Sequence, residues 1–197
     1  MAEFKVITGT DLKNLSRFSY VYVFEPKKDL KKDPKDWKYE VSILIPKSDK
    51  KGVKMLKAAI EGAKEDGIER KVYKGKILEK NFHYPLKDGD DEEREDDEAY
   101  HGHYYLSART SIKPGIRDKQ NEAITDRTEF YSGCFGRASV SFFPYEVEGK
   151  KGVGVSLNGL QKVKDGDSLG GGSSNAEKDF EDYKVDEDDI DEDDMLG

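Results

Sequence analysis

The sequence has few cysteines and few apolar residues, and both shortages exclude classes of protein. Its one cysteine, Cys134, has no partner for an internal disulfide, which is typical of a reducing compartment. Hydrophobic residues make up only 35% of the 197 residues. No apolar run approaches the ~18 residues that a membrane helix needs, so a membrane protein is excluded. Residues 1–13 also lack the apolar core of a signal peptide, and we expect no secretion by that route.

Motifs that carry catalytic or cofactor chemistry are also missing. There is no phosphate-binding GxxxxGK[ST] loop, no CxxC or HExxH metal motif, and no legible Ser–His–Asp arrangement. His101 and His103 would project from one face of a strand, but a zinc site needs three or four ligands. Consecutive acids at 90–98 lack the converging geometry of a two-metal nuclease, so a solvated loop is the better interpretation. We therefore expect no enzyme, no metal and no cofactor.

The distribution of charge along the chain is more informative than the net charge of −8. From residue 165 onward, 14 acidic residues face two lysines, a net of −12, which leaves +4 for residues 1–164. Within that body the acidic segment, defined as residues 88–98, carries nine acids and one arginine. The rest of the body is therefore +12. A basic body with acidic appendages is expected to attract polyanions.

Two early segments read as strands because apolar and polar residues alternate. In 17–24, Phe18, Tyr20, Tyr22 and Phe24 are expected on one face. In 37–46, the expected shared face runs from Trp37 to Ile45. Residues 100–110 read as a further strand, 113–118 as a turn, and 137–145 with 153–163 as a hairpin.

One helix is predicted after Pro46. Ser48 is the expected cap, Val53, Leu56, Ile60 and Ala63 form one buried stripe, and Gly67 is the expected stop. Six or seven strands with a single interior helix favour a mainly β fold, a small closed Greek-key barrel, over a sandwich. The predicted domains are a barrel at 1–164, including the acidic segment, and a flexible tail at 165–197 with a Gly/Ser hinge at 170–174.

Aromatic residues alternate with cations along the body, as in Trp37–Lys38–Tyr39. Single-stranded nucleic acid is bound by this combination, since cations follow the phosphates and rings stack on unpaired bases. The competing interpretation is that most rings fill the barrel core. Phe142 and Phe143 are expected to point to opposite faces because they are neighbours on a strand.

The block YSGCFGRASVSFFPY (131–145), followed by GKKGVGVSLNGLQKVKDG (149–166), resembles the single-stranded DNA-binding proteins of tailed bacteriophages, a group related to the podophage replication binding protein. KPGIRDKQNEAITDRTEF (113–130) fits the same pattern, and so does the order of lysine-rich barrel, acidic loop, glycine hinge and acidic tail. The specific part of the resemblance is 113–166.

The resemblance implies an OB fold that binds and protects single-stranded DNA without sequence preference in phage replication, recombination and repair. The expected location is the cytoplasm of the infected bacterial host. The acidic tail would compete for the DNA groove and recruit polymerase, helicase or nuclease, and a homodimer is among the expected assemblies. The podophage relatives end in an aromatic residue whereas this chain ends Met195–Leu196–Gly197, so the identity of the tail's partner stays open. The alternative function is a recombination mediator or acidic interaction hub with secondary DNA binding.

Candidate DNA-contacting residues are rings and cations on strands or neighbouring loops. The stacking candidates are Tyr20, Tyr22, Trp37 and Tyr39. The phosphate-binding candidates are Lys38, Lys71, Lys74, Lys76, Arg109, Lys113, Arg117 and Arg137. Arg137 follows a Gly133–Gly136 segment where backbone can approach a ligand or, equally, turn a barrel corner. The partner-binding tail candidates are Asp191, Asp193, Asp194, Met195 and Leu196.

Overall fold

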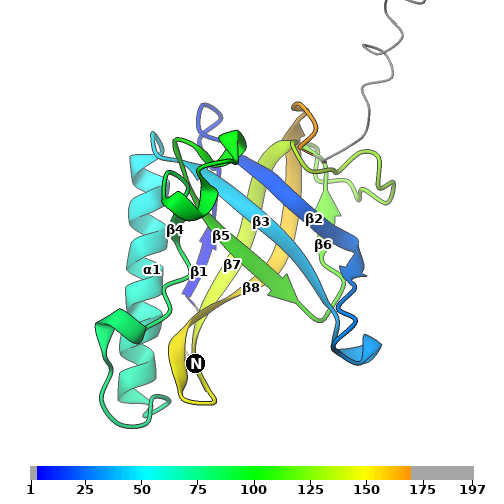
Figure 1. The fold of residues 1–197 in the computed structure, drawn as a ribbon. Helices are drawn as coiled ribbons and strands as arrows, with labels where there is room; N and C mark the ends of the chain where they lie inside the picture. Colours follow the sequence, from blue (N-terminus) through cyan, green and yellow to red (C-terminus); the bar gives the residue numbers. More distant parts are fainter. Residues whose placement is uncertain (1–3, 170–197) are drawn as a thin grey trace, which may run out of the picture.

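The computed structural model describes residues 4–169, and they form a closed ring of five strands with one long helix (Figure 1). The predicted hinge at 170–174 and the tail candidates lie outside the described residues. The ring strands are β2 (Ser16–Lys27), β3 (Lys38–Pro46), β5 (His103–Thr110), β8 (Lys150–Lys164) and β7 (Phe135–Val147).

The ring closes in Greek-key order. β2 pairs with β3, β3 with β5, β8 with β7 and β7 with β2, all antiparallel, whereas β5 and β8 are parallel. This order of strands is that of an OB fold. The expectation of a mainly β, closed Greek-key fold with one main helix is confirmed.

Three further strands extend the ring. β1 (Phe4–Ile7) pairs with β7, β4 (Lys87–Asp88) with β5, and β6 (Gly115–Arg117) with β8. β6 falls in the segment predicted to be only a turn, and β1 was not predicted. Both are short, so their conformation depends on the longer partner strand rather than on their own pattern. Four 3₁₀ turns complete the described chain: Pro34–Asp36, Glu79–Asn81, Glu92–Arg94 and Glu98–Tyr100.

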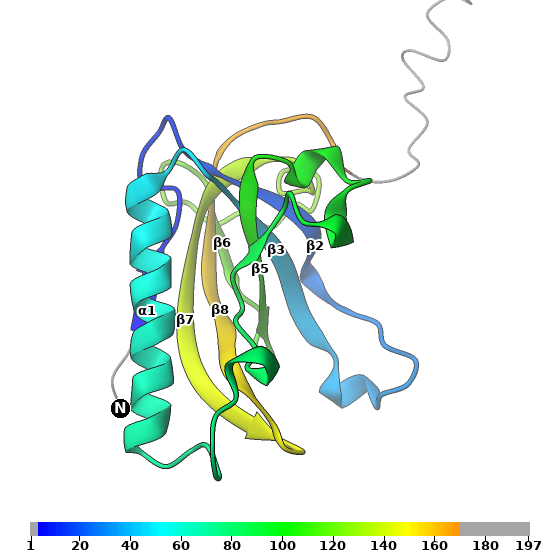
Figure 2. The ribbon, with the colours of Figure 1, turned by 60° about the vertical axis from the view of Figure 1, so that its left-hand side comes forward.

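Helix α1 (Lys50–Glu69) lies against β1 and β7 and closes one side of the core (Figure 2). The predicted stripe is confirmed, since Val53, Leu56, Ile60 and Ala63 are all buried. Asp49, not Ser48, caps the helix, because its carboxylate accepts the amide hydrogen of Gly52 at 2.9 Å. No helix among the described residues combines the length and apolar character required to cross a bilayer.

The prediction that Gly67 ends the helix is wrong, because this residue lies inside α1. A Cβ on this residue would stand 2.5 Å from the ring of Tyr73 and 2.6 Å from Pro144. The glycine therefore permits close packing of α1 on the loop after it and on β7. The helix continues to Glu69.

A β-bulge in β2 overturns the predicted common face of Phe18, Tyr20, Tyr22 and Phe24. The register with β3 shifts between Ser19 and Tyr22, and Tyr20 has a φ of +48°. The extra residue reverses the alternation, so Phe18 and Val23 are fully buried while Tyr20 and Tyr22 are 46% and 39% exposed. Two of the predicted stacking rings are thereby placed on the surface.

The hairpin expected from 137–145 and 153–163 across residues 148–151 is confirmed. Its strands are longer than predicted, since β7 and β8 pair from Phe135 with Lys164 to Val147 with Lys150, so the turn is only residues 148–149. Beyond β8 the described chain stays on the barrel. Asp167 accepts a hydrogen bond from Arg17 through its carbonyl at 2.9 Å, and the amide of Leu169 donates to the carbonyl of Ser132.

Candidate nucleic-acid interface

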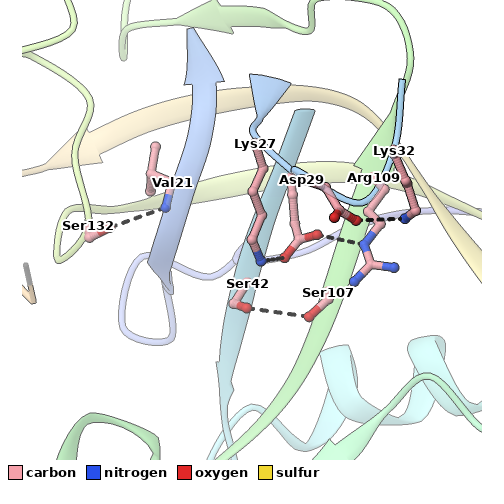
Figure 3. A network of polar contacts seen from close by, with 9 residues as sticks. Val21, Lys27, Asp29, Lys32, Ser42, Ser107, Arg109 and Ser132 are labelled. Atoms are coloured by element: carbon pink, nitrogen blue, oxygen red, sulfur yellow. Dashed lines mark hydrogen bonds and ion pairs between the residues drawn. The ribbon is translucent and has the colours of Figure 1, made fainter. Parts of the chain in front are cut away.

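The outer face of β3 and β5 presents a polar surface because the other face fills the core. Val41 and Ile43 point inward and are fully buried, so Glu40 and Ser42 point outward. On β5, Ser107 and Arg109 point outward opposite them, and Ser42 and Ser107 hydroxyls are 3.4 Å apart (Figure 3).

A groove of about 1280 Å³ runs along this face. β5 forms its floor. One wall is the β2–β3 loop (residues 28–37) with the start of β3, and the other is the β7–β8 hairpin; the two project on either side below β3 and β5 (Figure 1). OB folds bind oligonucleotides across their second and third strands, between the loops joining strands 1–2 and 4–5. β3 and β5 are the second and third ring strands, so the groove occupies that position.

Cations outnumber acids along the groove. Its basic side chains are Lys32, Lys38, Lys87, Arg94 and Arg109, and its acidic ones are Asp36 and Glu93. Glu93 pairs with Lys87 at 3.3 Å. The remaining positive charge is suited to a polyphosphate.

Exposed apolar and aromatic side chains line the hairpin wall. Phe143, Tyr145 and Val147 contribute from β7, and Phe143 and Val147 are 46% and 60% exposed. Phe142 is buried, so the predicted split between the two phenylalanines is confirmed. The ring of Phe143 lies over Gly154, where a Cβ would be 2.4 Å from the ring. The glycine thus lets the ring of Phe143 pack closely against β8 while the residue stays partly exposed.

The acidic segment closes one end of the groove. Most of its residues are exposed to solvent, as expected, but the segment is anchored to the sheet. The Arg94 guanidinium lies 4.4 Å from the ring centre of Tyr100, 5.1 Å from that of Tyr105 and 5.8 Å from that of Tyr20. Tyr100 and Tyr105 pack edge to face on each other. Together with Leu44 they form a small apolar cluster on the outer face. Aromatic and cation–π contacts therefore hold the segment on the sheet.

Lys47 provides a second anchor for the acidic segment. Its ammonium binds Asp88 and lies 2.7 Å from Asp90. These hydrogen bonds lower the pKa of both carboxyls, with the amide of Gly102 adding to the effect on Asp90, and raise the pKa of Lys47. The anchor is therefore charged on both sides at neutral pH.

Hydrogen bonds within the β2–β3 loop fix the other wall. Asp29 accepts the amide hydrogen of Lys31 and pairs with Lys32 at 3.1 Å (Figure 3). The indole N–H of Trp37 donates to the carbonyl of Asp29 at 2.9 Å. Trp37 ends a 3₁₀ turn rather than starting β3, and it is half-buried beside Lys38.

His83 lines the groove next to Lys87 and near Tyr145, whose ring centre is 6.3 Å away. Partial burial lowers the pKa of His83, and the positive charges of Lys87 and Arg109 lower it further. The imidazole is therefore neutral at pH 7 in the unbound protein.

The structure brings only some of the sequence-predicted residues together. Of the candidates, Lys38 and Arg109 line the groove. Trp37 and Tyr39, which flank Lys38 in sequence, and Lys113, which follows the groove residue Ile112, are not among its lining residues. Tyr20 lies beside Arg94 at the closed end.

The remaining predicted residues are also absent from the groove lining. Tyr22 borders a separate cleft with Arg127 and Tyr131. The loop carrying Lys71, Lys74 and Lys76 follows α1 and is bound to the hairpin, where Glu146 accepts the Lys74 amide hydrogen. Arg117 is on β6, paired with Gln161 of β8. Arg137 donates to the carbonyl of Gly9 at 3.1 Å and to Gln161 at 2.8 Å, which fits the barrel-corner interpretation.

Sequence reasoning missed several groove residues. The candidates do not include Phe143 and Tyr145 of β7, Lys32 of the β2–β3 loop or Lys87 of β4. The alternation of β7 carried a usable signal, because a Phe–Phe pair on one strand must place one ring outside. In the described part of the chain, His101 and His103 bond to the carbonyls of Glu95 and His101, and no three His, Cys, Asp or Glu side chains gather as a metal site.

Comparison with known proteins finds a family model and a relative that cover most of the chain. A family model described as the Enterobacter phage Enc34 ssDNA-binding protein matches residues 4–192. A relative named putative protein p50, from Acyrthosiphon pisum secondary endosymbiont phage 1, is 33% identical over 153 residues, covering 76% of this chain and 81% of the relative.

Two solved structures share the fold. The single-stranded DNA-binding protein of bacteriophage Enc34, in complex with ssDNA, superposes with a TM-score of 0.68 at 23% identity, over 84% of this chain and 88% of that one. The gp2.5 single-stranded DNA-binding protein of bacteriophage T7 gives a TM-score of 0.50 at 17% identity, over 96% and 99%.

Proposed function

The chain belongs to the family of the phage Enc34 single-stranded DNA-binding protein, and from this membership we propose that it binds single-stranded DNA without sequence preference in the groove over β3 and β5. Its relatives are binding proteins and not enzymes. The observation that carries the proposal is the groove itself, in which cations on the floor and loop wall face the exposed ring of Phe143 and the half-buried ring of Tyr145 on the hairpin wall.

The chemistry of a single strand matches the two sides of the groove. Lys32, Lys38 and Arg109 supply charge to the phosphates, and Phe143 and Tyr145 offer faces to unpaired bases. Bases in a duplex are stacked on one another and cannot reach the rings. We therefore expect single strands to bind more tightly than duplex.

The phage role follows from the same proposal. A protein that coats single strands acts in DNA replication, recombination and repair, in the cytoplasm of the infected bacterium. The acidic tail, including Asp191, Asp193, Asp194, Met195 and Leu196, would recruit replication proteins and compete with DNA for the groove, since a tethered polyanion has a high local concentration. A homodimer remains part of this proposal.

The proposal is tested by gel shift with the full chain and one sequence supplied as single-stranded DNA, duplex DNA and RNA at several salt concentrations. We expect single-stranded DNA to bind more tightly than duplex, with an affinity that falls as salt rises because phosphate contacts release counterions. Equal affinity for duplex, or no binding at low salt, would overturn it.

Tail competition has a separate test in the full chain. Replacing Asp191, Asp193 and Asp194 by Asn removes three negative charges and should raise the affinity for single-stranded DNA at low salt. The matched control removes three exposed charges outside the groove, Glu65, Glu69 and Glu122, each replaced by Gln. An equal rise in both variants would show a general charge effect and refute competition by the tail.

A further inference from the structure

The face of β3 that would meet a polyanion carries a nearly buried carboxylate. The side chain of Glu40 is 11% exposed and points outward, between Ser42 and Lys38 on the same face. A negative charge at this place should weaken DNA binding by simple repulsion. Its presence therefore needs an explanation.

Each oxygen of Glu40 holds one cation. Oε2 accepts from Nε of Arg109 at 2.7 Å, and Oε1 accepts from Nζ of Lys27 at 3.2 Å. Glu40 and Arg109 are directly opposite in the β3–β5 register, so both backbones are fixed by the sheet. The three side chains together keep one positive charge.

Stability is a weak explanation for this arrangement. The two cations are 61% and 46% exposed. Ion pairs with such exposed partners contribute little to folding because water and salt screen them. The carboxylate has a more specific effect on the orientation of the Arg109 side chain.

The bond to Nε fixes the guanidinium while leaving both Nη groups unused by Glu40. Arg109 lines the groove floor, so these four N–H donors are available to a ligand there. A planar arginine fork matches phosphate oxygens and loses less entropy when it is already oriented.

On the basis of the proposed function, we propose that Glu40, which is itself held by Lys27, is a positioning residue that orients Arg109 for contact with the DNA phosphates. Repulsion and positioning predict opposite signs for removal of this carboxylate. Repulsion alone predicts tighter DNA binding, and positioning predicts weaker binding.

The experiment measures binding of the full chain to fluorescent oligo-dT by anisotropy at several salt concentrations. Glu40→Ala should weaken binding about fivefold to tenfold, because a charged hydrogen bond to phosphate is lost or loosened. The slope of log affinity against log salt should fall by about one. Glu40→Gln keeps one acceptor oxygen for Nε of Arg109. Its affinity for oligo-dT should therefore lie between those of the wild type and Glu40→Ala.

Asp36→Asn is the matched control, since Asp36 is an exposed acid lining the same groove. Its removal should tighten binding. A double-mutant cycle completes the design: in an Arg109→Ala background, Glu40→Ala should no longer weaken binding. Circular dichroism melting of each variant shows that it is folded.

The outcomes separate the two proposals. If the wild type binds and Glu40→Ala binds more tightly, as Asp36→Asn does, the positioning role is wrong. The same holds if Glu40→Ala weakens binding equally with and without Arg109. A wild type that fails to bind oligo-dT would overturn the proposed function and the positioning role together.

Discussion

Individual side chains decide which rings of this protein meet a ligand. Phe142 and Phe143 are adjacent, yet one is buried in the core and the other is 46% exposed on the groove wall. Trp37, the sole tryptophan in the sequence, has its indole N–H bonded to Asp29 within the β2–β3 loop, so its position reports on that wall. Residue type alone does not distinguish these rings, whereas their position on a strand does.

Phe143→Ala should weaken binding of single-stranded DNA by about 1–3 kcal/mol, the usual cost of losing one base-stacking ring. Because the ring is exposed, the midpoint of thermal unfolding should change little. Tryptophan quenching titrations with oligo-dT measure the affinity. Unchanged affinity in a folded variant would exclude Phe143 from the interface.

His83 gives the groove a pH dependence. Its pKa lies below the ordinary value, so the unbound ring is neutral at pH 7, whereas nearby phosphates would favour the protonated form. Binding should therefore take up a proton, and affinity should increase as pH falls from 7 toward 5.5. His83→Gln should flatten this part of the profile in anisotropy titrations, and an unaltered profile would contradict the assignment.

At the scale of elements, helix α1 shows how packing overrides propensity. Gly→Ala inside a helix ordinarily stabilises by about 1 kcal/mol. At Gly67 the new methyl would collide with Tyr73 and Pro144, and such overpacking costs about 1–3 kcal/mol. Gly67→Ala should thus lower the free energy of unfolding in urea, and a more stable variant would show that the loop moves away easily.

The sequence predicts the long elements but not their irregularities. Alternation locates β3, β5 and the β7–β8 hairpin, and 3.6-residue periodicity locates α1, because each of these buries one whole face. The bulge in β2 is different: the amide of Val21 donates to the hydroxyl of Ser132, which is 111 residues away in sequence (Figure 3). No local pattern encodes such a partner.

The groove was only partly predictable for the same reason. Lys38 and Arg109 are candidates because they are cations on predicted strands. Their convergence with Phe143 depends on ring closure between β5 and β8, which brings distant segments together. The cations at Lys71, Lys74 and Lys76 look equivalent in sequence, yet they follow α1 and lie outside the groove lining.

At the scale of the whole molecule, charge is separated into distinct regions. The acidic segment closes one end of a cationic groove and is fixed there by Arg94 and Lys47. Arg94→Ala should remove this anchor and leave Tyr100 and Tyr105 less protected. Hydrogen exchange should then quicken selectively in residues 88–102, at a cost of about 0.5–2 kcal/mol for the lost cation–π contacts. Unchanged exchange there would show that Arg94 is not needed to hold the segment.

The central claim is that single-stranded DNA lies in the groove between the β2–β3 loop and the β7–β8 hairpin. Ultraviolet crosslinking of the full chain to oligo-dT, followed by peptide mass spectrometry, tests it most directly. We predict crosslinks in peptides containing Trp37, Tyr105, Phe143 or Tyr145. Crosslinks confined to the segment 71–76, to β6 or to the cleft beside Tyr22 would place the DNA elsewhere and contradict the account.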